Sequence, residues 1–302
     1  MLNLSFIFLI LITLFVGNAA LSVFLGIFFA YYFKISNTFY SRRVGTIPLQ
    51  IGIVILGATI SMPYALNVSS EYLPWISLFV IISFFSGLIL GRILGIHNRV
   101  AFLLSSGAAI CGGTAIAAVA PIIKAKPQEL LVAMTIVFLL NAIAIIFFPI
   151  VGSYLEMSNF EFGAWSALVI HDTSSVIGAA LSYSNDSAQA AATLKLGRTI
   201  WLIPLILIAN WIRNKQIKAA KFPTFILFFI AAIFTNSILN LNDEITNFLQ
   251  ILSQAFLLVG LFCIGSQFNP NEMKSISSKP LIMALIIWAV VIPSAYALVK
   301  YF

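Results

Sequence analysis

Titratable and hydroxyl side chains interrupt one long apolar stretch of the chain, Phe162–Tyr183. The interruption consists of His171, Asp172, Thr173, Ser174 and Ser175. Imidazole titrates near neutral pH, so His171 is a candidate carrier of a coupled proton, together with Asp172. Asp172 also has a structural alternative, which is to cap a helix that begins at Ser174. The hydroxyls of Thr173 and Ser174 are candidate substrate ligands with the same ambiguity.

A second interruption, rich in glycine, divides the apolar stretch Val100–Ile123. It consists of Cys111, Gly112, Gly113 and Thr114. Glycine resists helix formation and exposes its N–H group, so a helix is expected to break here. A half-helix that starts at Thr114 would aim free N–H groups and a positive dipole end at the break, which favours an anion. The structural alternative is that these small residues let neighbouring helices pack closely.

Two cations share one face of a third apolar stretch, Ala188–Ile212, because Lys195 and Arg198 are three residues apart. A guanidinium so far inside an apolar stretch needs a partner. Arg198 is therefore expected to pair with Asp172 or to bind a substrate oxyanion through two hydrogen bonds. Lys195 is a second candidate substrate ligand, and its alternative is to snorkel to the outer membrane interface.

The elements that must position these residues are transmembrane helices. Of the 302 residues, 61% are hydrophobic and 8% are charged, and the mean hydropathy is +1.07. A soluble domain carries about a quarter charged residues, so most of this surface must face lipid. The sequence predicts an all-α polytopic membrane protein, a single transmembrane domain over residues 1–302, with about 9–11 spanning helices.

The predicted segments leave no stretch long enough for a soluble domain. They are Leu4–Val16, Ala19–Phe33, Thr46–Met62, Leu73–Leu94, Val100–Ile123, Gln128–Ile150, Phe162–Tyr183, Ala188–Ile212, Phe222–Leu239, Thr246–Phe268 and Pro280–Val299. The two interrupted segments are either broken spanning helices or re-entrant hairpins. Hairpins are favoured because they keep Lys124 and Lys126 on the side of the other basic loops and leave Asp186 outside.

Loop charges predict the orientation in a bacterial inner membrane. Basic clusters alternate with loops that hold acidic residues only, and the positive-inside rule places the basic clusters in the cytoplasm. The N-terminus is then cytoplasmic and the C-terminus is outside. The basic clusters are Lys34, Arg42 and Arg43; Arg92 and Arg99; Arg213, Lys215, Lys218 and Lys221; and Lys274 and Lys279. The acidic loops hold Glu71, Glu156, Glu161, Asp243 and Glu244.

Two internal similarities suggest repeated units. Ile51–Ala58 resembles Val259–Ser266, with Gly52 opposite Gly260, and the loop charges place the two copies in opposite orientations. Inverted repeats, here around 46–94 and 246–299, are typical of secondary transporters. A weaker similarity aligns Cys111–Ala118 with His171–Gly178. Chance resemblance between glycine-rich apolar helices is the alternative for both.

The run Ile110–Ala125, which reads ICGGTAIAAVAPIIKA, resembles the ICGASA…APVIKA signature of the sulfate exporter family of bacterial membrane proteins. Gln50–Ser61, Ile170–Ala180 and Lys195–Pro204 resemble that family in the same order. The resemblance implies an inverted-repeat transporter related to bile-acid, arsenite and riboflavin carriers. The sequence departs at Gly113, where the family has Ala or Ser, and at Ser174-Ser175, where it often has Ala-Gln. These departures leave the substrate open.

The leading hypothesis is a proton-coupled secondary transporter of a small anion, such as a sulfur oxyanion or a sulfonate. The alternatives are a passive anion channel, a non-transporting sensor or scaffold, and an enzyme that uses Cys111 as nucleophile and His171 as base. No nucleotide-binding motif or metal-ligand spacing appears in the sequence. We therefore expect no enzyme activity, cofactor, metal or nucleic-acid partner. The expected partners are a small anion and the lipid bilayer, with a homodimer as one open arrangement.

Overall fold

The computed structural model describes residues 2–34, 39–44, 47–213, 224–239, 241–267 and 278–301. Throughout these ranges the regular structure is α-helical. Five helical stretches among them are long and apolar enough to cross a membrane, and shorter apolar helices accompany them. The predicted fold class, an all-α polytopic membrane protein, is confirmed.

The helices follow most of the predicted apolar segments. A short helix at Tyr40–Val44 was not predicted, the helix within Thr46–Met62 covers only Ile47–Gly57, and two further differences are described below. In chain order they are α1 (Leu2–Val16), α2 (Ala19–Phe33), α3 (Tyr40–Val44), α4 (Ile47–Gly57), α5 (Met62–Ile93), α6 (Asn98–Ala109), α7 (Gly113–Val119), α8 (Pro127–Tyr154), α9 (Asn159–Val169), α10 (Thr173–Tyr183), α11 (Asn185–Thr199), α12 (Leu202–Arg213), α13 (Thr224–Leu239), α14 (Asp243–Ser266) and α16 (Ser278–Tyr301).

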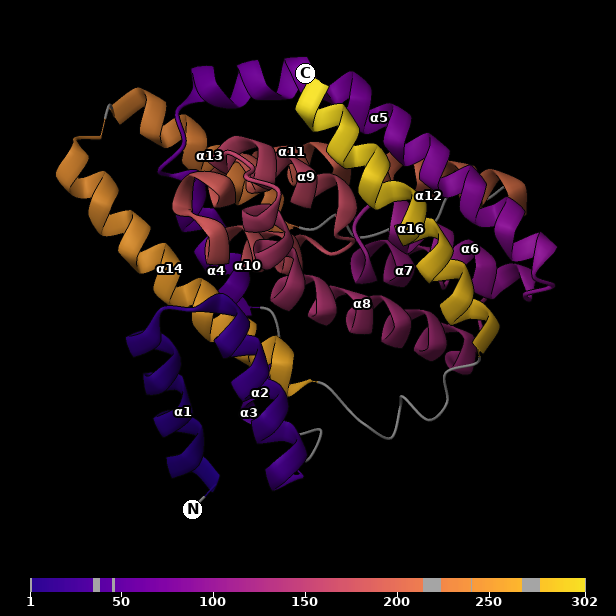
Figure 1. The fold of residues 1–302 in the computed structure, drawn as a ribbon, viewed down its shortest axis with the longest axis horizontal. Coiled ribbons are helices and arrows are strands. Elements are labelled where there is room, and N and C mark those ends of the chain that lie inside the picture. The colour runs from indigo at the N-terminus through magenta and orange to yellow at the C-terminus, as the bar shows by residue number, and fades with distance from the viewer. Residues whose placement is uncertain are drawn as a thin grey trace.

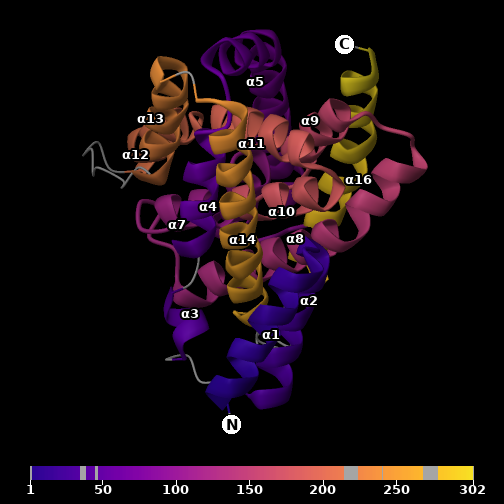
Figure 2. The same ribbon diagram turned by 90° about the vertical axis from the view of Figure 1, so that its left-hand side faces the viewer.

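The helices form two bundles that lie side by side (Figure 1). In the smaller bundle α14 packs mainly against α2 and α4, with α1 and α13 at the edges. In the larger bundle α11 packs against α5, α9 and α10, while α6, α7, α8 and α16 complete the core. The bundles touch mainly where α10 meets α2 and α14. The start of α1 and the end of α16 lie at opposite ends of the molecule (Figure 2).

Paired glycine contacts join α4 and α14 in the smaller bundle. A Cβ atom on Gly52 would lie 2.9 Å from Cγ of Leu257, and a Cβ atom on Gly260 would overlap Leu49. These two contacts are equivalent in the alignment of Ile51–Ala58 with Val259–Ser266. A pseudo-twofold axis between inverted repeats would produce such a pair, although the repeat itself stays a prediction.

The start of α5 differs from the prediction. The helix begins at Met62, whereas the sequence placed the start at Leu73. Ser61 is extended and Pro63 lies in the first turn, where the missing N–H of proline costs no hydrogen bond. Asn67, Ser69, Ser70 and Glu71 lower the hydropathy of this first part, and this concealed the beginning of the helix.

The predicted helix Ala188–Ile212 is divided in two. α11 ends at Thr199 and α12 begins at Leu202. Lys195 and Arg198 therefore lie in the last part of α11, which is largely buried in the larger bundle.

Several basic residues that predict the orientation lie outside the described part of the chain. This holds for Lys215, Lys218, Lys221 and Lys274, and for the side chains of Arg42, Arg43 and Arg213.

Candidate functional site

The first interrupted stretch folds as a re-entrant hairpin. α6 ends at Ala109 and α7 begins at Gly113. Between them Gly112 has a φ of +57°, which residues with a side chain rarely adopt. The chain reverses here, because the side chain of Ile116 packs against Gly107, where a Cβ atom would lie 2.8 Å from Ile116 Cδ1. A straight helix would separate these two residues by about 13 Å along its axis.

The two ends of this hairpin meet at one face of the molecule. His97, just before α6, has its Nδ1 3.1 Å from Oε1 of Glu129, in the first turn of α8. Arg99 Nη1 lies 3.7 Å from the other carboxylate oxygen of Glu129. Lys124 and Lys126 consequently return to the face that carries Arg99, as the hairpin interpretation requires.

The second interrupted stretch is also a hairpin, and it enters from the other side. α9 ends at Val169 and α10 begins at Thr173. Its ends meet where Ser187 Oγ donates a hydrogen bond of 2.6 Å to the carbonyl of Asn159. The two hairpins are connected by α8, whose 28 residues make a helix about 42 Å long. They therefore approach each other from opposite ends of the larger bundle.

The tips of the two hairpins touch. A Cβ atom on Gly112 would lie 3.0 Å from the Cβ of Asp172, so the close approach requires glycine. Oδ2 of Asp172 accepts hydrogen bonds from the backbone N–H groups of Ser174 at 3.1 Å and Ser175 at 3.3 Å. Asp172 is thus the N-cap of α10, which begins at Thr173, one residue earlier than the sequence indicated.

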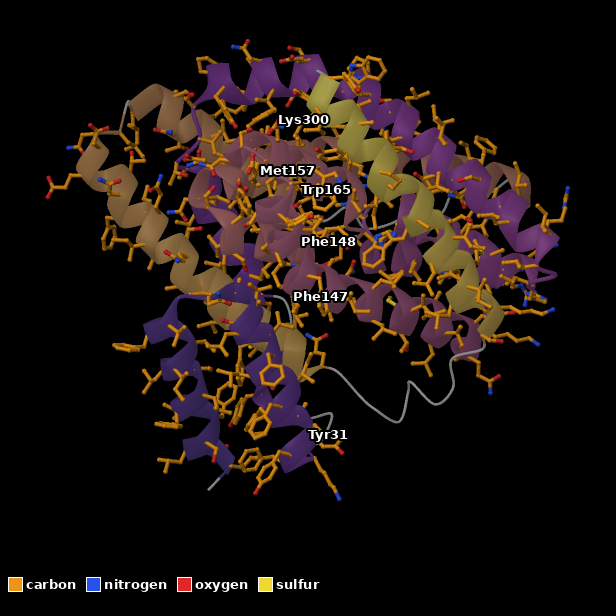
Figure 3. The ribbon with its side chains drawn as sticks, in the orientation of Figure 1. Tyr31, Phe147, Phe148, Met157, Trp165 and Lys300 are labelled. Atoms are coloured by element: carbon orange, nitrogen blue, oxygen red, sulfur yellow. The ribbon has the colours of Figure 1, made fainter. Side chains whose placement is uncertain are left out.

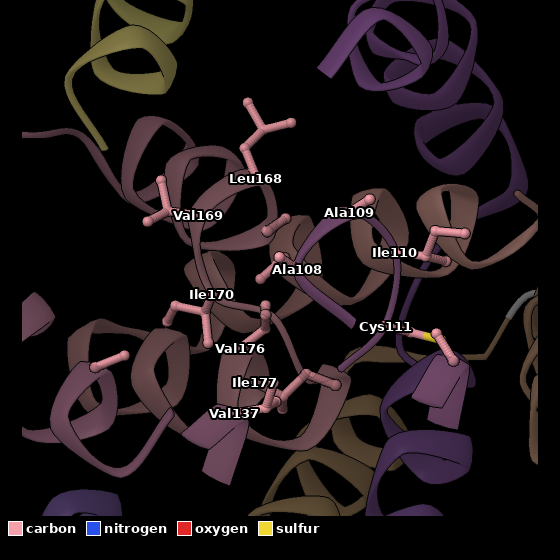
Figure 4. Packing of buried hydrophobic residues seen from close by; sticks show 14 of the residues in the cluster. Ala108, Ala109, Ile110, Cys111, Val137, Leu168, Val169, Ile170, Val176 and Ile177 are labelled. Carbon is pink, nitrogen blue, oxygen red and sulfur yellow. The ribbon is translucent and has the colours of Figure 1, made fainter. Parts of the chain in front are cut away.

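Arg198 binds both hairpins at once. Its Nε donates to the carbonyl of Ala109 at 2.7 Å, and its Nη2 donates to that of Ala108 at 2.6 Å. Its Nη1 donates to the carbonyls of Ala167 at 3.0 Å and Leu168 at 2.6 Å. Figure 4 shows the tip of the first hairpin beside the end of α9, where these carbonyls lie.

These four carbonyls belong to the last turns of α6 and α9. Carbonyls at a helix C-terminus have no partner within their own helix, and the negative dipole end favours a cation. The side chain of Arg198 is only 1% exposed, so it satisfies these groups where water could not. Its hydrogen bonds go to carbonyls and none of them to Asp172. A direct contact of Arg198 with substrate stays a prediction.

Lys195 supports the second hairpin from the same face of α11. Its Nζ donates to the carbonyl of Ile170 at 2.7 Å and lies 3.4 Å from that of Ala167. The residue is fully buried, so the snorkelling alternative is wrong. Because Lys195 contacts only one hairpin while Arg198 contacts both, its ammonium is the less constrained of the two buried cations.

The remaining predicted ligands divide into two groups. Cys111, Gly112 and Thr173 are buried at or beside the tips, and Gly113 lies against the ring of Phe138 from α8. Ser174 is partly exposed beside them. Thr114 differs from these residues, because it is exposed.

His171 lies in an aromatic pocket at the tip of the second hairpin. Its ring stacks on Trp288 of α16, with centroids 5.8 Å apart and planes inclined by 20°. Trp288 also contacts Phe148, which stacks on Trp165 with centroids 4.8 Å apart (Figure 3). Within the described part of the chain, Nδ1 of His171 is buried without a hydrogen-bond partner. A buried nitrogen in this state can accept a proton or a ligand donor.

Further polar groups lie near this core, and the sequence indicated one of them, Asn141, as an interhelical hydrogen-bond partner or a ligand. Asn141 of α8 is buried, and neither atom of its amide has a partner among the described residues. The interhelical hydrogen bond expected for Asn141 is therefore not formed in this structure. Thr59, Gln189 and Asn236 line a polar cavity between the two bundles. Gln189 gave no signal because it is an isolated polar residue in a helix rich in alanine.

The known proteins to which this chain is similar are named as membrane proteins. The family model described as conserved hypothetical protein 698 matches residues 5–284. A UPF0324 membrane protein of Bacteroides thetaiotaomicron is 34% identical over 282 residues, which is 93% of this chain and 86% of that protein. A UPF0324 membrane protein of Shewanella oneidensis is 37% identical over 254 residues, 84% of this chain and 80% of that protein. No solved structure shows significant similarity.

Proposed function

The chain belongs to the family described as conserved hypothetical protein 698, and we propose that it is a secondary transporter of a small anion. The observation that carries the proposal is the meeting of two opposed hairpins over two buried cations, Arg198 and Lys195. Backbone that is irregular at membrane depth is stable only when it is buried in protein or lines a cavity. Opposed broken helices around a central site are the usual construction of secondary transporters.

The charges around the tips favour an anion. Arg198 and Lys195 contribute two positive charges when both are protonated, and Asp172 contributes one negative charge. The C-terminal ends of α6 and α9 add roughly half a negative charge each, and the N-terminal ends of α7 and α10 add roughly half a positive charge each. About one positive charge remains uncompensated, and a bound anion would neutralise it.

The substrate class follows from the resemblance to the sulfate exporter family. It supports a sulfur oxyanion or a sulfonate, held at the tips by Cys111, Gly112, Gly113, Thr173, Ser174, Lys195 and Arg198. Thr114 is the weakest of the predicted ligands, because it is exposed whereas the others are buried or only partly exposed. The hydroxyls of Ser174 and Ser175, where the family often has Ala-Gln, would adjust the site to a particular anion.

A coupled proton is assigned to His171 and Asp172. Both lie at the tip of the second hairpin, and Nδ1 of His171 has no partner within the described residues. Protonation there would change the charge beside the anion site, which links the two binding events.

The proposed orientation places the first hairpin on the cytoplasmic side of a bacterial inner membrane. Its mouth carries Arg92, Arg99, Lys124 and Lys126, whereas the second hairpin opens beside Asp186. The positive-inside rule then gives a cytoplasmic N-terminus.

The test is counterflow in proteoliposomes that contain the purified protein. Vesicles loaded with unlabelled sulfate, sulfite, thiosulfate or a small sulfonate are diluted into a trace of the same labelled anion. A transporter accumulates label transiently above equilibrium, whereas a passive channel only equilibrates it. The absence of an overshoot for every anion, in the presence of equilibration, would favour the channel.

A further inference from the structure

A cavity of about 930 Å³ lies between the two bundles, away from the hairpin tips. Its walls come from the turn between α4 and α5, the start of α5, and parts of α11, α13 and α14. The polar side chains that line it are those of Thr59, Ser61, Tyr64, Asn67, Gln189, Asn236, Ser237 and Thr246. All of them are uncharged hydroxyl or amide groups.

This lining suits a solute in transit. Hydroxyl and amide groups both donate and accept hydrogen bonds, so they can replace water around an oxygen-rich anion. They provide no opposite charge to hold it. Within the described residues two of the groups retain capacity, because Ser61 makes no capping hydrogen bond with its side chain and Ser237 Oγ accepts one hydrogen bond, from Met62 N at 2.9 Å.

Hydrogen bonds connect the bundles at two points of this cavity: Met62 N of α5 donates to Ser237 Oγ of α13, and Gln189 pairs with Thr59 at the buried side. Gln189 Nε2 donates to Thr59 Oγ1 at 3.1 Å, and Thr59 Oγ1 donates to the carbonyl of Leu56 at 2.8 Å. Gln189 belongs to the larger bundle and Thr59 to the smaller one. Separation of the bundles would therefore break this bond.

The boundary between the bundles leads from this cavity towards the tips. α10 begins at the tip residue Thr173 and forms the wall of the larger bundle that faces α2 and α14. Farther along α10, a Cβ atom on Gly178 would lie 2.7 Å from Leu261 of α14, so the route is closed there in this structure. The outer end lies at the face that carries Asp186 and the mouth of the second hairpin, since Asp186 precedes Gln189 by one helical turn. We call this the acidic face.

We propose that this cavity is the vestibule through which the anion passes between the acidic face and the hairpin tips, with the Gln189–Thr59 hydrogen bond as its inner latch. The inference rests on the proposed transport function and adds the route and the residues that control access to it.

Thiol labelling tests the vestibule without a transport assay. The native Cys111 and Cys263 are buried, so the parent protein should react slowly. Ser61→Cys places a thiol in the cavity, and Ser105→Cys places a matched thiol at a buried position of α6. The probe is a membrane-impermeant anionic methanethiosulfonate, applied to right-side-out and to everted vesicles.

Ser61→Cys is expected to react at least about tenfold faster than Ser105→Cys, and only in right-side-out vesicles. Equal rates from both sides, reaction only in everted vesicles, or no reaction would overturn the vestibule. The latch is tested with a thiol at the tip, Thr173→Cys. Gln189→Ala removes one hydrogen bond of about 1 kcal/mol, so it should raise the labelling rate of the Thr173→Cys thiol about fivefold. An unchanged rate would reject the latch.

The outcomes separate this inference from the proposed function. Labelling as expected, together with no flux of any anion in proteoliposomes, would keep the access route and reject the transporter. Anion counterflow without labelling of Ser61→Cys would keep the transporter and reject the route.

Discussion

Gly112 and Asp172 lie against each other where the two hairpins meet, with room for no side chain at position 112. The two residues are equivalent in the alignment of Cys111–Ala118 with His171–Gly178. Below them Arg198 donates to carbonyls of both hairpins, including those of Ala108 and Leu168 at 2.6 Å each. A single guanidinium thus fixes two opposed helix breaks relative to each other.

Gly112→Ala tests the contact between the tips. Alanine would meet Asp172 and would be strained at a φ of +57°, so the variant should lose about 1–3 kcal/mol of stability. The matched control is Gly113→Ala, at the first position of α7, where a change within about 1 kcal/mol is expected. Thermal unfolding in detergent compares the two. Equal effects of both substitutions would show that the tip contact is not specific.

Arg198→Lys tests whether one residue holds both hairpins. Arg198 makes four hydrogen bonds to carbonyls, whereas an ammonium has three donors on one nitrogen, so at least one of these buried carbonyls would lose its partner. A loss of at least about 3 kcal/mol is expected, measured by thermal unfolding. Arg92→Lys makes the same change on an exposed side chain and should leave the unfolding temperature unchanged. A stable Arg198→Lys protein would argue against this role.

His171→Gln tests the coupled proton. If His171 carries it, anion flux in proteoliposomes depends on pH in the range of about 5 to 8, and this dependence disappears in the variant. His97→Gln changes the other histidine, at the mouth of the first hairpin, and should keep the pH profile. A profile that survives in His171→Gln would assign the proton to another group.

We expect the stability of the protein to fall in acid because of Glu161, a carboxylate in the first turn of α9, outside the membrane core. The backbone N–H of Ser158 donates to this carboxylate at 2.7 Å and, with the Lys300 ammonium at 3.1 Å, lowers the pKa of Glu161 below its usual value. The folded state therefore binds this proton more weakly than the unfolded state, so the stabilisation is complete at neutral pH and is lost as the pH falls through the lowered pKa. Wild type should unfold at a higher temperature than Glu161→Gln at pH 7.

The difference between wild type and Glu161→Gln should shrink below about pH 4, where the free carboxyl group is protonated. A difference that is independent of pH would mean that the capping contact contributes nothing through its charge.

Much of the fold could be predicted from the sequence, because a segment that crosses lipid must be apolar and must satisfy its backbone hydrogen bonds internally. The apolar segments gave the helices, and the glycine and His-Asp interruptions gave the places where α6 and α9 end. The return of Lys124 and Lys126 to the face of Arg99 followed from charge alone. In each case a local signal decided the structure.

The arrangement of the site could not be predicted in the same way. The partners of Arg198 are backbone carbonyls, which every residue has, so the sequence cannot mark Ala108 or Leu168 as ligands. The sequence indicated Asp172 instead, because it is an acidic side chain inside an apolar stretch and could pair with a buried guanidinium. The exposed position of Thr114 depends on how α7 folds back along α6, and this is a tertiary feature.

The most direct test of the anion site is flux with one buried charge removed. Lys195→Gln keeps a hydrogen-bond donor towards Ile170 but removes the positive charge, while Arg198 still holds the hairpins. Thermal unfolding first checks that the variant is folded, and uptake of labelled sulfate, sulfite, thiosulfate or a small sulfonate is then driven by an imposed pH gradient. We predict saturable uptake of one of these anions by wild type and a rate at least about tenfold lower in the variant. Equal uptake by a folded Lys195→Gln protein, or no uptake by wild type, would contradict the account.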